Sequence, residues 1–194
     1  MGDFKVTRIS RICEDIEDIE VLHLPNYLVR YGFSGLLRAI SKALLFSLNL
    51  HGNNLTSTTG LHFVNLIELD LSANSISCLA GFDSLVNLKD LNLSSNLIKN
   101  IPNNIDHFKY LISLEKLNLS YNLLVSIPGL AQLSSKNHVI QEILLHGNCI
   151  TNPNECSNAL KNVRTLKFLN IKDNPIDGIR GSQTYQIFQR TIII

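Results

Sequence analysis

Hydrophobic and polar residues follow a short pattern that recurs along the chain. The clearest copy is Leu-Asn-Leu-Ser-Ser-Asn at residues 91–96. Extended backwards, each copy has the form L-x-x-L-x-L-x-x-N, with Ile at some of the Leu positions. The six copies begin at Leu45, Leu66, Leu88, Leu114, Ile140 and Leu166, so the first two intervals are 21 and 22 residues and the last three are 26. A fixed period of this length indicates a stack of similar coils.

Within each copy, alternation predicts a short strand with one buried side. Leu91 and Leu93 point into the protein, whereas Asp90, Asn92 and Ser94 point to solvent. No single coil can bury its own leucines, so each coil needs its neighbours. The asparagine that closes each copy can satisfy backbone groups of the turn. Six of them are expected to stack as a buried ladder: Asn53, Asn74, Asn96, Asn122, Asn148 and Asn174.

The segments between the strands predict an α/β solenoid, a curved right-handed horseshoe with a parallel concave sheet. The first two coils are short, so their return segments are expected to be extended or 3₁₀. Residues 103–112 and 154–163 are predicted to be convex helices. Their inward positions are Ile105, Phe108 and Leu111 in the first, and Cys156, Leu160 and Val163 in the second. Residues 132–138 form a polar bulge and a candidate functional loop.

The two ends differ from the repeats. Residues 1–44 are predicted to be a partly helical cap, since the first coil of a solenoid needs a lid; a docking segment is the alternative. Residues 4–19 suit an amphipathic helix, residues 19–24 also suit a strand, and Ser34 suits a helix N-cap. Residues 45–194 are the expected six-coil solenoid with an incomplete C-terminal cap, including a short helix after Ser182. The apolar residues 191–194 would leave an open edge, so we expect a fragment or a covering segment downstream.

Candidate binding residues must come from the outward positions. Equivalent outward positions of the six copies form columns. The first column contains Ser47, Glu68, Asp90, Lys116, Glu142 and Phe168, and the second contains Asn49, Asp70, Asn92, Asn118, Leu144 and Asn170. The third contains His51, Ser72, Ser94, Ser120, His146 and Lys172. The first half of this face is polar and acidic, whereas the second carries Tyr121, Leu144 and Phe168. Exposed apolar and aromatic side chains dominate binding surfaces. The hypothesis is that these three, with Lys116 and His146, bind a protein partner; the alternative is that a loop or the C-terminal segment covers them.

Composition and motifs favour a binding module over an enzyme. There are 17 basic and 16 acidic residues and no Trp, which argues against direct nucleic-acid binding. The six histidines are scattered, no Cys/His cluster has metal-ligand spacing, and no glycine-rich phosphate loop is present. We therefore expect no catalytic residue, no cofactor and no metal, and a monomer. No apolar run is long enough to cross a membrane.

The cysteines and the N-terminus bear on the compartment. The four cysteines are scattered and lack the paired clusters that cap many secreted repeat proteins. Cys78 and Cys149 fall at or beside core positions, where Cys acts as a small hydrophobe. The first residues have no apolar run of signal-peptide type. Together these features favour a cytoplasmic protein.

The full pattern, L-x-x-L-x-L-x-x-N-x-I-x-x-I, resembles intracellular leucine-rich repeats of phosphatase-regulator, spliceosomal A-prime and dynein light-chain proteins. Residues 48–54, 69–77, 117–122 and 145–148, with the polar bulge before Ile140, also resemble the repeat domain of the leucine-rich-repeat and coiled-coil centrosomal protein family. That resemblance covers about residues 45–176 and implies an interaction scaffold at the centrosome or basal body. The alternative is a regulatory subunit of a phosphatase or of a nuclear ribonucleoprotein.

This sequence departs from the centrosomal family in three respects. The closing segment of that family continues through Tyr to Leu-Pro and Leu-Asp, but here only Tyr185 is present. Residues 1–44 are longer than the family's N-terminal segment. The chain also has no coiled-coil heptads, so the second half of the family's architecture is missing from it.

Overall fold

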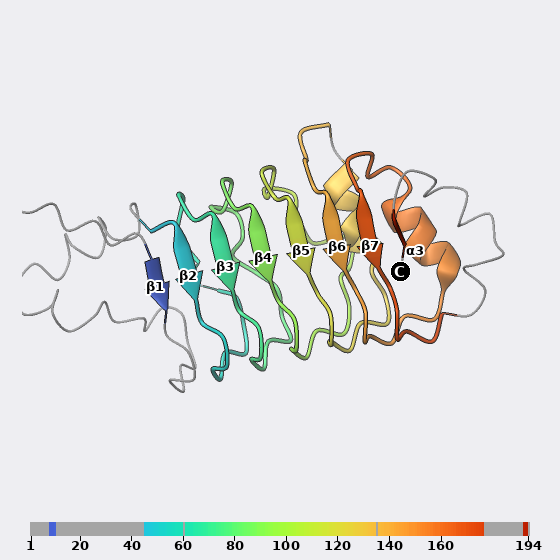
Figure 1. Cartoon of the computed structure of the whole chain (residues 1–194), viewed down its shortest axis with the longest axis horizontal. Coiled ribbons are helices and arrows are strands. Elements are labelled where there is room, and N and C mark those ends of the chain that lie inside the picture. Colours follow the sequence, from blue (N-terminus) through green and yellow to red (C-terminus); the bar gives the residue numbers. More distant parts are fainter. Residues whose placement is uncertain (1–7, 11–44, 60, 135, 177–191, 194) are drawn as a thin grey trace, which may run out of the picture.

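A computed structural model describes residues 8–10, 45–59, 61–134, 136–176 and 192–193. Within these residues, eight short strands form one parallel sheet in which spatial order follows chain order (Figure 1). The strands are β1 (Arg8–Ser10), β2 (Ser47–Asn49), β3 (Glu68–Asp70), β4 (Asp90–Asn92), β5 (Lys116–Asn118), β6 (Glu142–Leu144), β7 (Phe168–Asn170) and β8 (Ile192–Ile193). The six predicted repeat strands are therefore present.

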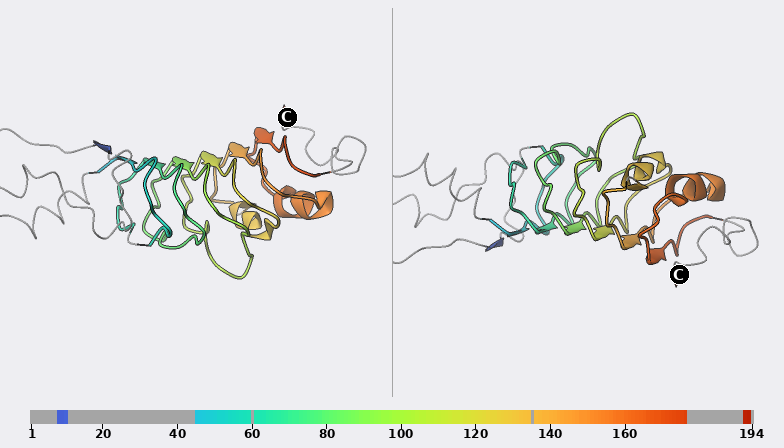
Figure 2. Two further views of the ribbon diagram at one scale, coloured as in Figure 1. Left: turned by 90° about the horizontal axis from the view of Figure 1, so that it is seen from below. Right: turned by 90° about the horizontal axis from the view of Figure 1, so that it is seen from above.

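The strand register follows the repeat. The central residues of β2–β7 pair in one row across the sheet: Leu48, Leu69, Leu91, Leu117, Ile143 and Leu169. All six are buried, whereas the flanking residues of each strand are exposed or half-buried. The sheet forms one side of each coil and the return segments form the other (Figure 2). The predicted solenoid is confirmed, although the sheet is open and the row of strands is only shallowly curved.

Leucine and isoleucine side chains from all six coils form one continuous core. Burial of each Leu contributes about 1.5–3 kcal/mol, before the cost of ordering the chain. Phe82 and Phe108 stack between coils, with ring centroids 6.3 Å apart. Because every coil contacts mainly the coils beside it, the stability of this core depends on neighbouring coils together.

The closing asparagines join adjacent coils, as predicted. Asn122 lies in the fourth coil. Its Nδ2 donates to the carbonyl oxygen of Leu93 in the third coil at 2.9 Å, and to those of Leu119 at 3.1 Å and Ser120 at 3.2 Å in its own coil. Asn122 Oδ1 accepts the N–H of Ile98 at 3.1 Å. The same four contacts recur at Asn74, Asn96, Asn148 and Asn174, each with its own neighbours. Each asparagine thus satisfies backbone groups of two coils.

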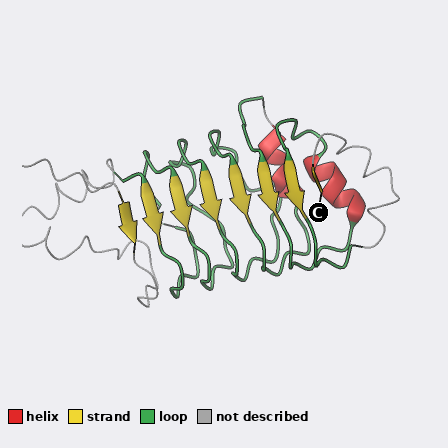
Figure 3. Cartoon of the chain, in the orientation of Figure 1, coloured by secondary structure: helices red, strands yellow, loops and turns green. Residues whose placement is uncertain are grey.

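Two helical segments lie among the described residues, both towards the C-terminal end (Figure 3). Helix α3 (Pro153–Leu160) confirms the helix predicted at 154–163. Asn152 caps it by accepting the N–H groups of Asn154 and Glu155, and Pro153 occupies the first turn, where no backbone donor is needed. The 3₁₀ helix η2 (Pro128–Ser134) precedes it and overlaps the predicted polar bulge.

The helix predicted at residues 103–112 is wrong. This segment consists of turns, and Ile105 is 50% exposed, although Phe108 and Leu111 are buried as expected. The side chain of Gln132 in the next coil explains the difference. It accepts the N–H of Phe108 at 3.0 Å and donates to the carbonyl of Ile105 at 2.6 Å, so it binds the backbone groups that a helix would pair internally.

At the two ends, the structure extends the sheet. Arg8–Ser10 forms strand β1 and pairs with β2, so this part of the predicted 4–19 helix is wrong. Ile192–Ile193 forms β8 and pairs with β7. The rest of residues 1–44, including Cys13, and the helix expected after Ser182 lie outside the described residues.

The cysteine environments also differ from the prediction. Cys78 and Cys149 are exposed rather than part of the core. Only Cys156, on the inward side of α3, is buried among the described cysteines, and burial raises the pKa of its thiol to about 12. A thiol with this pKa stays protonated and packs as an apolar side chain.

Candidate binding surface on the parallel sheet

The outward side chains of β2–β7 form a continuous surface, called here the sheet face. Its first row follows the strand register as Ser47, Glu68, Asp90, Lys116, Glu142 and Phe168. Its second row contains Asn49, Asp70, Asn92, Asn118, Leu144 and Asn170. The columns predicted from the sequence are therefore neighbours in space. The face divides into an acidic half on β2–β4 and an apolar half on β5–β7.

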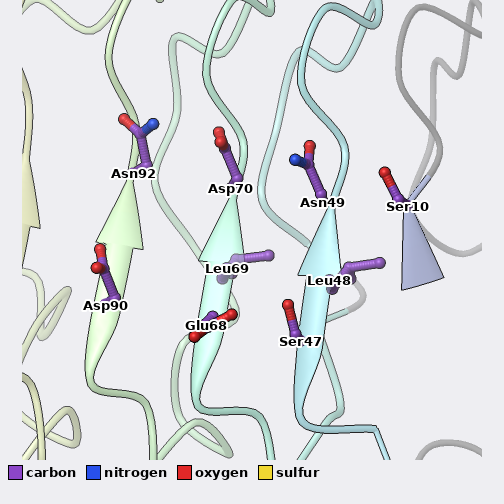
Figure 4. Close-up of a pocket in the computed structure, with 9 residues that line it drawn as sticks. All are labelled: Ser10, Ser47, Leu48, Asn49, Glu68, Leu69, Asp70, Asp90 and Asn92. Atoms are coloured by element: carbon purple, nitrogen blue, oxygen red, sulfur yellow. The ribbon is translucent and has the colours of Figure 1, made fainter. Parts of the chain in front are cut away.

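The acidic half contains a shallow hollow of about 390 Å³. Figure 4 shows the side chains around it, with Glu68, Asp70 and Asp90 presented from β3 and β4. Burial raises the pKa of the Asp90 carboxyl, and the nearby Glu68, Glu142 and Asp70 raise it further, while Lys116 opposes them. The negative charges on this half are therefore only partly balanced by Lys116.

Most side chains of the second row stabilise the turn at the end of their strand through a hydrogen bond. In five coils the Asn or Asp side chain accepts the backbone N–H two residues later, at 2.9–3.1 Å. Where serine occupies that later position, its hydroxyl donates to the same oxygen. Leu144 of β6 is the exception, because it has no side-chain oxygen to accept such a bond. An apolar residue at this position gives up a local hydrogen bond and leaves a half-buried Leu on the sheet face.

Tyr121 is the most exposed large hydrophobic side chain among the described residues, at 58%. It follows β5 in the left-handed backbone region, with φ of 54°, and its N–H donates to the carbonyl of His146 at 2.9 Å. Its ring meets the His146 imidazole edge to face, with centroids 4.9 Å apart. A Cβ at Gly147 would lie 2.6 Å from Tyr121 Cδ1. The missing side chain of Gly147 therefore makes room for the tyrosine ring.

The structure places four of the five predicted site residues on or beside β5–β7, and brings Tyr121 and His146 into direct contact. Leu144 on β6 pairs in register with Asn170, and Phe168 on β7 pairs with Glu142. Phe168 and Leu144 are half-buried, which leaves part of each side chain accessible. These four residues are called the apolar patch below. Lys116 is exposed but pairs in register with Asp90 and Glu142, so it belongs to the charged row at the border of the patch.

The sequence analysis missed two features of this patch. Gly147 is one of six residues that follow the strands with positive φ, together with Gly52, Ala73, Ser95, Tyr121 and Asp173. The Gly at this position in two repeats was the available signal. The second feature is the Nδ1 atom of His146, which is buried without a hydrogen-bond partner in the described structure.

No group of three or more His, Cys, Asp or Glu side chains among the described residues is placed to hold a metal ion. None of the described helices has the length and apolar character needed to span a membrane. The sheet face, with acidic residues on one half and the apolar patch on the other, is suited to surface contacts.

Comparison with known proteins supports the same architecture. A family model described as Leucine Rich Repeat matches residues 113–133. No match to a curated protein was found. A crystal structure of the TLR13–ssRNA13 complex is similar over 90% of this chain, with a TM-score of 0.67 and 24% identity. The chain spans about a quarter of that protein, since 23% of its length is covered.

The likeness to TLR13 concerns the fold alone, because the identity is low. The matched repeat motif includes β5 and the turn that contains Tyr121 and Asn122. The same motif recurs in six coils with one strand register and one asparagine ladder. On these grounds the chain has a leucine-rich-repeat solenoid fold.

Proposed function

We propose that this chain is a non-enzymatic interaction scaffold that binds a protein partner through the apolar patch of its sheet face. The observation behind the proposal is Leu144, which replaces the hydrogen-bonding Asn or Asp of the other five coils. Tyr121 and Phe168 beside it supply aromatic surface of the kind that anchors protein interfaces. Lys116 and Glu142, which pairs in register with Lys116 and with Phe168, supply charged groups beside these side chains.

The proposed partner is a protein that inserts an apolar side chain beside Leu144 and Phe168. Direct nucleic-acid binding is a weaker candidate, because the formal net charge is +1 and the sheet face carries Glu68, Asp70 and Asp90. The proposal assigns no catalytic residue and no cofactor. Leucine-rich-repeat solenoids are typical of binding modules, but a fold alone does not assign a function, so the support for this proposal is the apolar patch.

Quantitative affinity capture tests the proposed surface. Leu144→Asp with Phe168→Asp places two charges in the apolar patch without altering a fully buried residue. A matched control is Val64→Asp with Ile112→Asp, two exposed apolar positions outside the strands. We expect the patch variant to lose its specific partners and the control to keep them. Equal recovery by both variants, with both folded by circular dichroism, would refute the patch.

For the cellular setting, we propose the centrosome or basal body, with a cytoplasmic pool. The support is the resemblance in order and length of coils to the centrosomal repeat family. The alternative setting is the nucleus or cytoplasm as a regulatory subunit of a ribonucleoprotein or a phosphatase. Imaging of a tagged protein against a centriole marker separates these settings. Diffuse or nuclear staining, with phosphatase or splicing components recovered by capture, would favour the alternative.

A further inference from the structure

A second hollow, of about 490 Å³, lies between the fourth and fifth coils, and none of its lining residues belongs to the apolar patch. Its lining comes from the end of η2 and from two loops: the one after η2 and the one between α3 and β7. Both project at the edge where β6 and β7 begin (Figure 1). Its lining comprises Leu133, Ser134, Lys136, His138, Asn162, Arg164 and Thr165. The sequence had already marked residues 132–138 as a candidate functional loop.

The lining is positively charged and contains no carboxylate. Among the described residues the ion pairs are Lys89–Glu115 and Lys109–Asp106, so neither Lys136 nor Arg164 has a described acidic partner. Two cations that share a hollow with no acidic partner among the described residues repel each other and attract an anion. Since the whole chain has a formal charge of only +1, this charge is local to the hollow.

The neutral residues of the lining supply hydrogen-bond donors, and the loop that carries some of them is held to the core. Ser134, Asn162 and Thr165 contribute hydroxyl and amide groups. His138 is buried, and its Nε2 lies 3.2 Å from the carbonyl oxygen of Phe108, which ties the loop to the core. Leu133 is buried beneath the same loop. Cations beside neutral donors are the arrangement that holds a tetrahedral oxyanion.

We propose that this hollow binds the phosphate group of a phosphorylated serine or threonine side chain in a partner protein. A phosphomonoester carries a charge of about −1.5 to −2 at neutral pH, which matches two cations. A nucleic acid would need a longer run of cations and stacking aromatics, and the lining has no aromatic ring apart from the imidazole of His138. An anionic membrane would need about four to eight clustered basic residues, more than the two found here.

The test uses the whole chain and a degenerate peptide library with a fixed central phosphoserine. Libraries with central serine or central glutamate, and inorganic phosphate, serve as comparison probes. The site variant is Lys136→Ala with Arg164→Ala. The control is Lys161→Ala with Lys167→Ala, which removes the same charge from exposed positions outside the lining.

We expect binding of the phosphoserine library to exceed that of the serine and glutamate libraries. The site variant should weaken it about tenfold or more, as expected for lost charge-assisted hydrogen bonds, while the control stays near wild type. Equal loss in both variants would overturn the proposal in favour of general charge attraction. Equal binding of the three libraries, or tight inorganic phosphate binding with no gain from peptide, would also overturn it. Neither result depends on the apolar patch, so failure here leaves the proposed function intact.

Discussion

Single residues decide how the coils join. Asn122 binds carbonyl groups of two coils and the N–H of Ile98. Of these carbonyls, that of Ser120 also accepts the N–H of Ser95 at 2.9 Å. His107 is buried at 8% exposure, and burial lowers the pKa of its imidazole. Both side chains are buried and polar. The contribution of Asn122 to stability depends on its hydrogen-bond partners, and that of His107 depends on its protonation state. Both lead to measurable predictions.

Replacing Asn122 with Ala should destabilise the fold by about 2–4 kcal/mol, because several buried backbone groups lose their partner together. Asn104→Ala is the matched control, since Asn104 is exposed. Chemical denaturation of both variants measures the two free energies of unfolding. A loss below about 1 kcal/mol for Asn122→Ala would show that water replaces the asparagine.

Stability should fall on acidification through the titration of His107. The unfolded imidazole has a pKa of about 6.5, and the folded pKa is lower, so the unfolded state binds the proton first. The free energy of unfolding therefore decreases as pH drops below about 6.5. His107→Asn should flatten this dependence between pH 7 and 5, whereas His62→Asn, at an exposed position, should not. Identical pH profiles for wild type and His107→Asn would contradict the assignment.

At the scale of elements, the strands follow from local sequence patterns, whereas the conformation of a return segment also depends on contacts with the next coil. Alternation of apolar and polar residues is local, and it correctly predicted β2–β7. The spacing of Cys156, Leu160 and Val163 predicted helix α3, and the recurring asparagine predicted the ladder. At residues 103–112, where the predicted helix is absent, Gln132 from the next coil binds the backbone of Ile105 and Phe108. That contact is long-range, so single-coil periodicity could not predict it.

The turn after β6 offers a test of the contact between Tyr121 and Gly147. Gly147→Ala should cost about 2–3 kcal/mol, since the methyl group meets the ring and the φ of +66° disfavours a side chain. In a Tyr121→Ala background the same change should cost only about 1 kcal/mol, the backbone part. Denaturation of the wild type, the two single variants and the double variant gives the coupling free energy between the two substitutions. An unchanged cost in both backgrounds would mean that the ring moves freely.

Asp90 on β4 is expected to have the opposite effect to His107: its protonation on acidification should raise stability. Because the pKa of Asp90 is raised, its carboxylate opposes folding above that pKa, and stability is gained as the group protonates. Asp90→Asn should therefore raise the free energy of unfolding at pH 7, on the order of 0.5 kcal/mol for this partly exposed site. Thermal unfolding at low salt is the measurement. A lowered melting temperature would show that the carboxylate is stabilising instead.

At the scale of the whole molecule, one sheet face carries acidic residues at one half and the apolar patch at the other. The repeat predicted which residues share this face, because strand register places equivalent positions side by side. It also placed Lys116 between Asp90 and Glu142, as the register shows. It did not predict that the missing side chain of Gly147 makes room for the Tyr121 ring, because that depends on a contact between coils. The second hollow likewise depends on two loops that are distant in the sequence.

The account depends most on binding at the apolar patch. The direct measurement is the dissociation constant of a captured partner for the purified chain, by calorimetry, with and without Leu144→Asp and Phe168→Asp. We predict a weakening of about a hundredfold or more, in keeping with loss of two interface anchors, and no change for Val64→Asp with Ile112→Asp. An unchanged dissociation constant for the folded patch variant would contradict the claim that this face binds the partner.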